Sequence, residues 1–174
     1  WDEDEPRFAA IAQTMVATGD WVVPMYNDSL AVDKPVLMHW CMAACFMLFG
    51  TSESAARLPS ALATLLTALA LLRAGTRFFN PTTGVVAALA FVGCLLVGIE
   101  SHAATPDAIL VALTTWITVL AAEVYLPHSS SRSSTVLTPQ LTIIRATSIG
   151  ALAGLAVLCK GPIGFIGPLA VVVP

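Results

Sequence analysis

The chain has 174 residues, of which 57% are hydrophobic and 11% are charged, and its formal net charge is −3. Soluble domains carry about 25% charged residues, so this composition predicts an integral membrane protein. The negative net charge argues against nucleic acid as a partner and provides no polybasic patch for anionic lipid headgroups. Apolar runs of about 20 residues follow one another along the chain, and each is long enough to cross a bilayer. We therefore expect an all-α, polytopic membrane bundle.

The ends and the cysteines add two expectations. The sequence begins at Trp1 without a Met or a signal peptide and stops at Pro174 inside an apolar run, so we expect it to be part of a longer protein. The cysteines lie in apolar segments without a Cys-x-x-Cys pattern or a histidine at ligand spacing, which favours small core residues over a disulfide framework or a zinc site. They are Cys41, Cys45, Cys94 and Cys159.

Two surface helices are predicted before the first span. Residues 5–18 carry apolar side chains at helical spacing and end at Gly19, which predicts an amphipathic helix lying along the membrane surface. Trp21 and Tyr26 fit an aromatic belt at the interface. Residues 36–50 are apolar but short for a span, which predicts a second surface or re-entrant helix. We expect 1–53 to form an extracytoplasmic loop and 54–174 a transmembrane bundle.

The remainder predicts four spans and the start of a fifth. The first two are expected at 58–72 and 83–99, and a third opens at Thr105-Pro106-Asp107 and runs through Leu126. Residues 128–140, rich in Ser, Thr and Pro, predict a loop before a fourth span at 143–158. Lys160-Gly161-Pro162 then breaks the helix, and a new apolar run begins at Ile163.

Alternate crossings bring the polar residues of distant segments to one face of the membrane. Lys and Arg divide four and four between the two faces, so the positive-inside rule does not decide the orientation. We interpret Arg73, Arg77, Arg132 and Arg145 as topology signals. Whatever the orientation, one face collects Asp4, Glu5, Arg7, Asp33, Lys34, Asp107 and Lys160.

This face has the residue types of a group-transfer site. Asp4, near a helix start and one turn before Arg7, should stay ionised, and it can act as a general base on a hydroxyl or bind a divalent cation. Lys34 and Lys160 are compact positive charges suited to phosphate oxygens.

Simpler interpretations remain open at this point. The acidic opening residues, 1–5, would serve equally as a helix cap and a solubilising segment. Asp107 and Lys160 would serve as ordinary charges at the membrane edge. Packing or interface roles are favoured for His39, His102 and Glu100.

Several short motifs occur in an order that resembles a known family. They are Asp4-Glu5-x-Arg7-Phe8-Ala9, Gly19-Asp20-Trp21-Val22-Val23-Pro24, Asp33-Lys34-Pro35-Val36-Leu37-x-x-Trp40, Phe49-Gly50, Ala56-Arg57-Leu58-Pro59-Ser60, Thr105-Pro106-Asp107-Ala108 and Lys160-Gly161-Pro162. In this order they resemble the membrane glycosyltransferases of the protein O-mannosyltransferase type, and within these the aminoarabinose transferases that modify lipid A. The resemblance extends over nearly the whole chain.

The resemblance implies a C-type glycosyltransferase fold and an inverting transfer of a sugar from a polyprenyl-phosphate donor to a hydroxyl of a lipid or protein acceptor. It implies Asp4 as the catalytic base and Lys34 and Arg7 as ligands of the donor phosphate. Glu5, Asp33, Asp107 and Lys160 would line the site. The one cofactor implied is a divalent cation at Asp33, which stands where the aminoarabinose relatives usually have a longer Glu.

The same resemblance implies a multi-pass protein of the plasma or inner membrane, surrounded by membrane lipid, with its active face extracytoplasmic. Two other hypotheses remain on the residues alone. A transporter-like module would show broken helices with charges near the middle of the membrane. A non-catalytic module would only assemble with other membrane proteins. The motifs define neither the donor sugar nor the acceptor.

Overall fold

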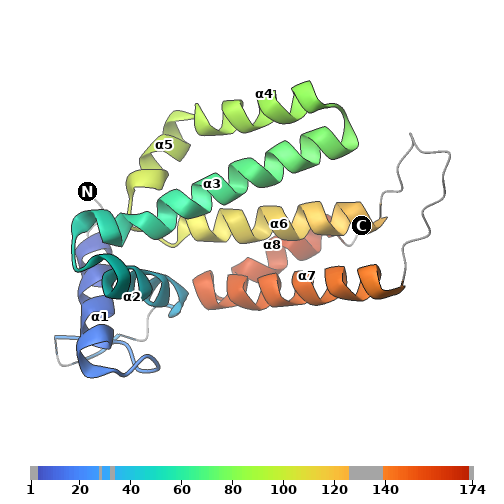
Figure 1. The fold of residues 1–174 in the computed structure, drawn as a ribbon. Helices are drawn as coiled ribbons and strands as arrows, with labels where there is room; N and C mark the ends of the chain where they lie inside the picture. Colours follow the sequence, from blue (N-terminus) through green and yellow to red (C-terminus); the bar gives the residue numbers. More distant parts are fainter. Residues whose placement is uncertain (1–3, 28, 32–33, 126–138, 173–174) are drawn as a thin grey trace.

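The computed structural model describes residues 4–27, 29–31, 34–125 and 139–172. This part of the chain forms eight helices and one short hairpin, which confirms the all-α fold (Figure 1). The helices are α1 (Asp4–Thr18), α2 (Leu37–Phe49), α3 (Glu53–Phe78), α4 (Pro81–Val92), α5 (Leu95–His102), α6 (Asp107–Tyr125), α7 (Pro139–Lys160) and α8 (Ile163–Val172). The hairpin pairs β1 (Met25–Tyr26) with β2 (Ser29–Leu30).

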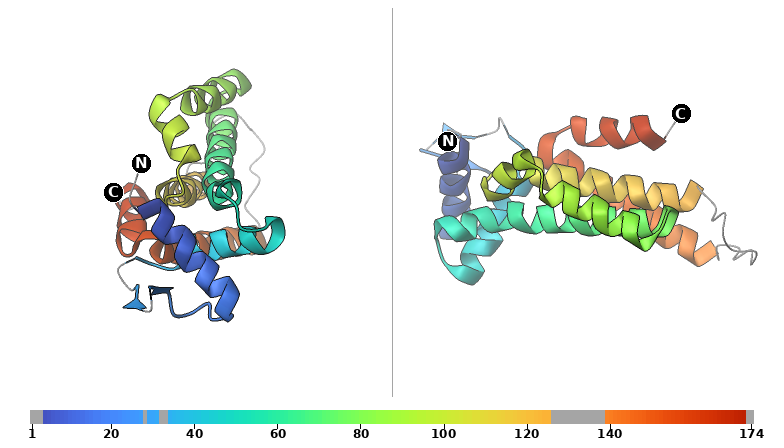
Figure 2. Two further views of the ribbon diagram at one scale, coloured as in Figure 1. Left: turned by 90° about the vertical axis from the view of Figure 1, so that its left-hand side faces the viewer. Right: turned by 90° about the horizontal axis from the view of Figure 1, so that it is seen from above.

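The long helices lie side by side, and α1 and α2 pack across one end of them (Figures 1 and 2). We call this end the α1 end and the opposite end the far end. α3 packs against α4 and α6, α6 packs against α7, and α8 folds back along both α6 and α7. α3 runs away from the α1 end, and α4 and α5 bring the chain back to it. α6 then runs away again and α7 returns, so the start of α6 and the end of α7 both lie at the α1 end (Figure 1).

Three helices are long and apolar enough to cross a membrane: Glu53–Phe78, Asp107–Tyr125 and Ile143–Lys160. They confirm the first, third and fourth predicted spans. Large apolar side chains remain exposed along their outer faces, for example Leu65 of α3 at 55% and Ile144 of α7 at 61%. Such exposed apolar surface is expected where lipid takes the place of water.

The segment of the second predicted span, 83–99, is divided between two helices. α4 and α5 pass the length and hydropathy test only together, and they are bent by 64° at the break between them. Gly93 and Cys94 separate the two helices, and the Cys94 N–H turns back to the carbonyl of Phe91. Cys94 is exposed at this break, so the prediction that every cysteine is a core residue is wrong.

The apolar side of α1 is covered by protein. Phe8, Ile11, Ala12 and Met15 are all at most 3% exposed, because this stripe packs against α2 and the hairpin. Residues 5–18 are helical, as predicted, but the face expected to lie on the membrane points into the protein. Gly19 ends α1 with a φ of 73°, a left-handed conformation that glycine adopts without strain.

α3 and α4 approach each other closely. Ser52 caps α3 by accepting the Ala55 N–H, and Asn80 caps α4 by accepting the Thr83 N–H at 2.7 Å. A Cβ on Gly84 would lie 2.6 Å from the Leu72 carbonyl oxygen, and one on Gly75 would lie 2.4 Å from the Gly84 Cα. The two glycines therefore allow the backbones to touch, and this contact positions α4 and α5 on α3.

The far end is held by a buried carboxylate. Arg73 of α3 donates two hydrogen bonds to Glu123 of α6, and Arg145 of α7 forms a further ion pair with the same side chain. The Glu123 side chain is 1% exposed. Arg73 and Arg145, interpreted above as topology signals, thus also join three helices. The predicted loop at 128–140 lies almost entirely outside the described residues, and α7 already begins at Pro139.

Candidate functional site

The start of α1 supplies the first candidate residues. Asp4 is the first residue of α1, where the helix dipole favours a negative charge, although its side chain lies outside the described part of the structure. Glu5 follows it, and its Oε1 accepts the Ala104 N–H at 2.5 Å. The other oxygen, Oε2, lies 3.8 Å from Nη2 of Arg57. The first turn of α1 is therefore attached to the start of α3 and to the turn that precedes α6.

Arg7 points along the other side of α1. Its guanidinium carbon lies 5.7 Å from the centre of the Tyr26 ring, a cation–π contact that fixes the direction of the side chain. The hairpin that carries Tyr26 is connected to α2, because Ala31 donates to the Pro24 carbonyl and Trp40 Nε1 donates to the Trp21 carbonyl at 2.7 Å. The expected contact of Arg7 with the donor phosphate stays a prediction, and the side chain of Asp4, one turn before it, lies outside the described part of the structure.

Lys34 lies just before α2 and is exposed. Asp33, the predicted metal ligand, lies outside the described residues. Among the described residues, no three His, Cys, Asp or Glu side chains lie together as ligands of a metal ion. The expected cation contact at Asp33 therefore stays a prediction, and no step below is assigned to a metal.

Asp107 and Lys160 come together although 53 positions separate them in sequence. Asp107 begins α6 and Lys160 ends α7, and the antiparallel packing of these helices places Lys160 Nζ on Asp107 Oδ1. Both side chains are almost half exposed, at 46% and 44%. Beside them Cys159 Sγ donates to the Pro106 carbonyl at 3.3 Å. The pair is thus fixed in place by the helix ends but stays accessible.

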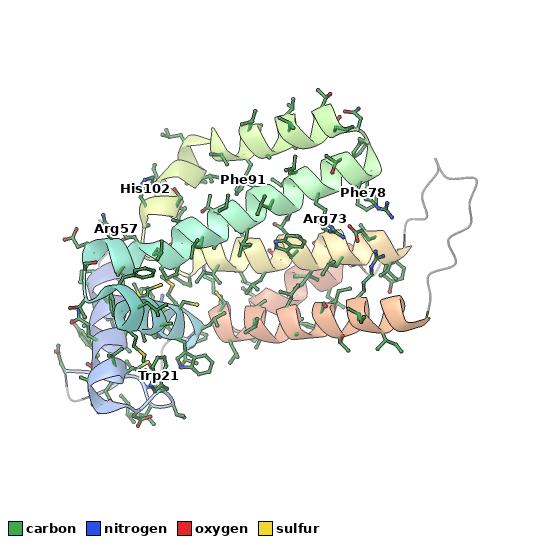
Figure 3. All side chains as sticks on the ribbon, in the orientation of Figure 1. Trp21, Arg57, Arg73, Phe78, Phe91 and His102 are labelled. Atoms are coloured by element: carbon green, nitrogen blue, oxygen red, sulfur yellow. The ribbon has the colours of Figure 1, made fainter. Side chains whose placement is uncertain are left out.

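Two cavities with charged side chains in their walls adjoin at the α1 end, and Glu5 and Arg57 line both. The larger, about 490 Å³, lies between α1, the end of α2 and the start of α3. The smaller, about 400 Å³, lies towards α5 and includes Glu100, His102 and Thr105. In Figure 3, Arg57 and His102 lie near each other at this end, whereas Arg73 lies towards the far end.

A third, more apolar cavity of about 690 Å³ runs along α6 and contains Lys160 at its wall. Its other lining residues are Leu71, Ala74, Leu110, Thr114, Thr115, Thr118, Val119, Ile163 and Gly167. The lining is thus shared by α3, α6 and α8 in the membrane-spanning part of the bundle. Such a cavity can hold an apolar chain with a polar group at the Lys160 end.

The two thiols of α2, Cys41 and Cys45, have low reactivity. Burial raises the pKa of the Cys41 thiol, and the neighbouring Cys45 raises it further. Burial also raises the pKa of Cys45. Because the thiolate is the nucleophile and the metal ligand, these α2 thiols are poorly suited to either role at neutral pH.

Two features of this structure were not predicted from the sequence. Arg57 was noted only as part of the motif Ala56-Arg57-Leu58-Pro59-Ser60, and nothing in the sequence pairs it with Glu5. Glu123 was not singled out, although a carboxylate inside an apolar segment is expected to have a charged partner. That rule could have indicated an arginine contact, but not which arginine.

The fold and the charged ends of its helices define a polytopic helical membrane protein with a polar site at one end of the bundle. Residues 33–173 match the family described as Dolichyl-phosphate-mannose-protein mannosyltransferase, and the chain belongs to this family.

Relatives of known name cover the whole chain. The undecaprenyl phosphate-alpha-4-amino-4-deoxy-L-arabinose arabinosyl transferase of Shewanella sediminis is 34% identical over 178 residues, and the protein of the same name from Yersinia pestis (strain Pestoides F) is 30% identical over 176. Each alignment covers 100% of this chain and 30% of the relative. The chain thus spans less than a third of the length of these relatives.

Two solved structures share the fold. The crystal structure of ArnT from Cupriavidus metallidurans bound to undecaprenyl phosphate matches with a TM-score of 0.84 and 27% identity, over 94% of this chain and 29% of that one. The same protein in the apo state matches with a TM-score of 0.80 and 23% identity, over 98% of this chain and 36% of that one. The helical membrane fold predicted from the sequence is confirmed.

Proposed function

We propose that the protein transfers a sugar from a polyprenyl-phosphate donor to a hydroxyl of a lipid acceptor, with inversion at the sugar carbon. The observation that carries this proposal is the 0.84 TM-score over 94% of the chain with a transferase structure that holds undecaprenyl phosphate. The names of the relatives support 4-amino-4-deoxy-L-arabinose as the sugar. We choose a lipid acceptor because the motifs resemble those of the aminoarabinose transferases that modify lipid A.

In this reaction the acceptor oxygen attacks C1 of the donor sugar, and Asp4 takes the proton from the attacking hydroxyl. The bond from C1 to the phosphate oxygen breaks, and polyprenyl phosphate leaves with the bonding electrons. Lys34 and Arg7 are proposed to stabilise the charge that develops on this phosphate. Asp4 is supported as the base by its place at the start of α1, where the dipole favours its ionised form.

The remaining residues are proposed to line the site. Asp107 and Lys160 lie at the ends of α6 and α7, at the same end of the bundle as α1. Glu5 reaches the turn before α6. Asp33 is proposed as a further lining residue beside Lys34. We place this site on the extracytoplasmic face, with residues 1–53 as the loop that carries Asp4 and 54–174 as the bundle below it.

A transporter-like module is the less suitable description. The break between α4 and α5 is a feature that such a module would have. However, the acid on this pair, Glu100, lies in the last turn of α5, and its Oε2 accepts the Thr105 hydroxyl at 3.0 Å. The buried Glu123 lies near the end of α6 in an ion pair. Neither has the mid-membrane position that an ion path requires.

The experiment uses the full-length protein in detergent or nanodiscs, with undecaprenyl-phosphate-linked aminoarabinose as donor and lipid A as acceptor. We expect mass spectrometry to show lipid A gaining one aminoarabinose for each undecaprenyl phosphate released. NMR of the product should show the anomeric configuration opposite to that of the donor. Active relatives serve as positive controls. If they consume the donor and this protein leaves it intact, the proposal is contradicted. Retention of configuration would contradict the single displacement.

A further inference from the structure

The Glu5–Arg57 contact joins three segments that are distant in sequence. Glu5 belongs to the first turn of α1, Arg57 to the second turn of α3, and Ala104 to the turn between α5 and α6. One carboxylate connects all three, with Oε1 on the Ala104 N–H and Oε2 facing the Arg57 guanidinium.

The same turn is fastened to α3 a second time. Ser60, one helical turn beyond Arg57, is fully buried and donates its hydroxyl to the Thr105 carbonyl at 3.2 Å. The Thr105 hydroxyl in turn donates to Glu100 of α5. The turn that leads into Asp107 is therefore fixed to α3 through Ser60, and the start of α1 is fixed to both through Glu5.

Burial makes the Arg57 charge important for Glu5. The Glu5 side chain is only 16% exposed, whereas that of Arg57 is 35% exposed. A largely desolvated carboxylate is costly unless a positive charge and hydrogen bonds compensate it. Arg57 supplies the charge and Ala104 supplies the hydrogen bond. Without Arg57, Glu5 is expected to turn towards water in one of the two adjoining cavities and release the first turn of α1.

We propose that Arg57 is a positioning residue for the transfer reaction: through Glu5, it fixes the start of α1, and with it Asp4, relative to Asp107 and Lys160. This inference rests on the proposed function, because it assumes that Asp4 acts at this end of the bundle. Arg57 itself need not touch either substrate. Its effect is therefore on the alignment of the base, and a displacement of about 1 Å at a reacting group can cost on the order of 100-fold in rate.

The test uses the full-length protein, with undecaprenyl-phosphate-linked aminoarabinose and lipid A. The variants are Arg57→Gln, Arg57→Lys, Glu5→Gln and the double variant Glu5→Gln/Arg57→Gln. Arg77→Gln is the matched control, because it makes the same substitution in α3 at the far end, where Arg77 is exposed. Glu5→Gln keeps an oxygen for the Ala104 N–H and removes only the charge that faces Arg57.

We expect Arg57→Gln and Glu5→Gln each to lower kcat on the order of 10- to 100-fold, with the KM for the donor changed by less than about twofold. The double variant should be no slower than the slower single variant, because the two residues act as one unit. Arg57→Lys should recover part of the rate, and Arg77→Gln should match the wild type. Wild-type kcat in Arg57→Gln would overturn the proposal. A raised donor KM with unchanged kcat would overturn it too, since it would make Arg57 a donor ligand.

Hydrogen exchange of the Phe8 and Ala9 amides, the first that can donate to carbonyl groups within α1, provides a readout that does not depend on activity. Exchange should increase in Arg57→Gln and Glu5→Gln and stay unchanged in Arg77→Gln. If Arg57→Gln does not fold, Glu5→Gln and Arg57→Lys carry the same test. Unchanged exchange in these variants would overturn the coupling. Inactive wild-type protein with the expected exchange pattern would instead contradict the proposed function alone.

Discussion

Arg73 and Glu123 form a two-point contact between α3 and α6. Arg73 Nε donates to Glu123 Oε1 at 2.7 Å, and Arg73 Nη2 donates to Oε2 at 2.9 Å. Arg145 of α7 adds an ion pair to Oε2 at 3.3 Å and a hydrogen bond to the Glu123 carbonyl at 3.2 Å. One buried carboxylate therefore holds the far ends of three helices, while the proposed chemistry takes place at the α1 end.

Replacing this carboxylate should destabilise the protein. Glu123→Gln leaves two arginines facing a neutral group, and removing one partner of a buried ion pair costs about 3–5 kcal/mol. Because Arg73 is 48% exposed, we expect the lower part of that range, measured as a reduced Tm of the full-length protein in detergent. Glu53→Gln, the same substitution at an exposed residue in the first turn of α3, is the control with little expected change. Equal Tm values for the two variants would contradict a structural role for Glu123.

The contact between α3 and α4 should not accept a side chain at Gly84. The added methyl group of Gly84→Ala would lie 2.6 Å from the Leu72 carbonyl oxygen and 2.8 Å from the Thr76 nitrogen. Because these are backbone atoms, α4 must move away, and overpacking of this kind costs about 1–3 kcal/mol. Gly154→Ala is the control, because a Cβ there meets nothing within 4 Å. The Tm should fall for Gly84→Ala only, and a fall of the same size in both variants would argue against this close contact.

Replacing Asp107 or Lys160 should reduce activity without reducing stability. Their side chains are almost half exposed, and exposed ion pairs contribute about 0–1 kcal/mol. Asp107→Asn and Lys160→Gln are therefore expected to leave Tm nearly unchanged but to reduce sugar transfer on the order of 100-fold, as the loss of a charge at a reacting centre does. Glu123→Gln is the useful contrast, since it should lower Tm more. Full activity in both site variants would exclude them from the site.

Asp20 should make the loop after α1 sensitive to acid. Its Oδ1 accepts the N–H groups of Val22 and Val23, at 2.9 and 3.1 Å, and these hydrogen bonds hold the pKa of Asp20 below its usual value. Because the pKa is lower in the folded state, the carboxylate stabilises this state above the unfolded pKa, and the contribution is lost as the pH falls through the folded pKa.

The measurement is the difference in Tm between wild type and Asp20→Asn as a function of pH. The asparagine keeps an acceptor oxygen but has no charge to titrate. We expect a constant difference at neutral pH that shrinks below about pH 4. A difference that stays the same throughout the acid range would show that ionisation of Asp20 does not matter for this loop.

Much of the helical framework follows from the sequence alone. The long apolar runs predict α3, α6 and α7, and the stop signals at Gly19 and at Lys160-Gly161-Pro162 agree with the ends of α1 and α7. The break between α4 and α5 was missed because Gly93-Cys94 lies within an apolar run and contains no proline or charge. The packing of α1 on α2 was also missed. An apolar stripe shows that one face of a helix is covered, but it does not distinguish cover by lipid from cover by another helix.

The candidate site was predictable only as a set of residues on one face. Counting crossings placed Asp107 and Lys160 on the same side, and the structure pairs them. The contact of Glu5 with Arg57 could not be obtained in this way, because it depends on the angle at which α1 crosses the end of α3. The choice of Arg73 and Arg145, rather than Arg77, as hydrogen-bonded partners of Glu123 likewise depends on helix rotation and packing, which the hydrophobic pattern leaves open.

The role of Asp4 as the base is the central claim, and the transfer rate of Asp4→Asn tests it most directly. The full-length variant is compared with wild type and with Asp2→Asn, a matched change two residues earlier at an acid that lies outside the motif Asp4-Glu5-x-Arg7. All three should insert into the membrane and elute identically on gel filtration. We expect Asp4→Asn to lose at least about 100-fold in transfer rate, as the loss of a general base does, and Asp2→Asn to retain wild-type activity. Wild-type transfer by Asp4→Asn would contradict the account.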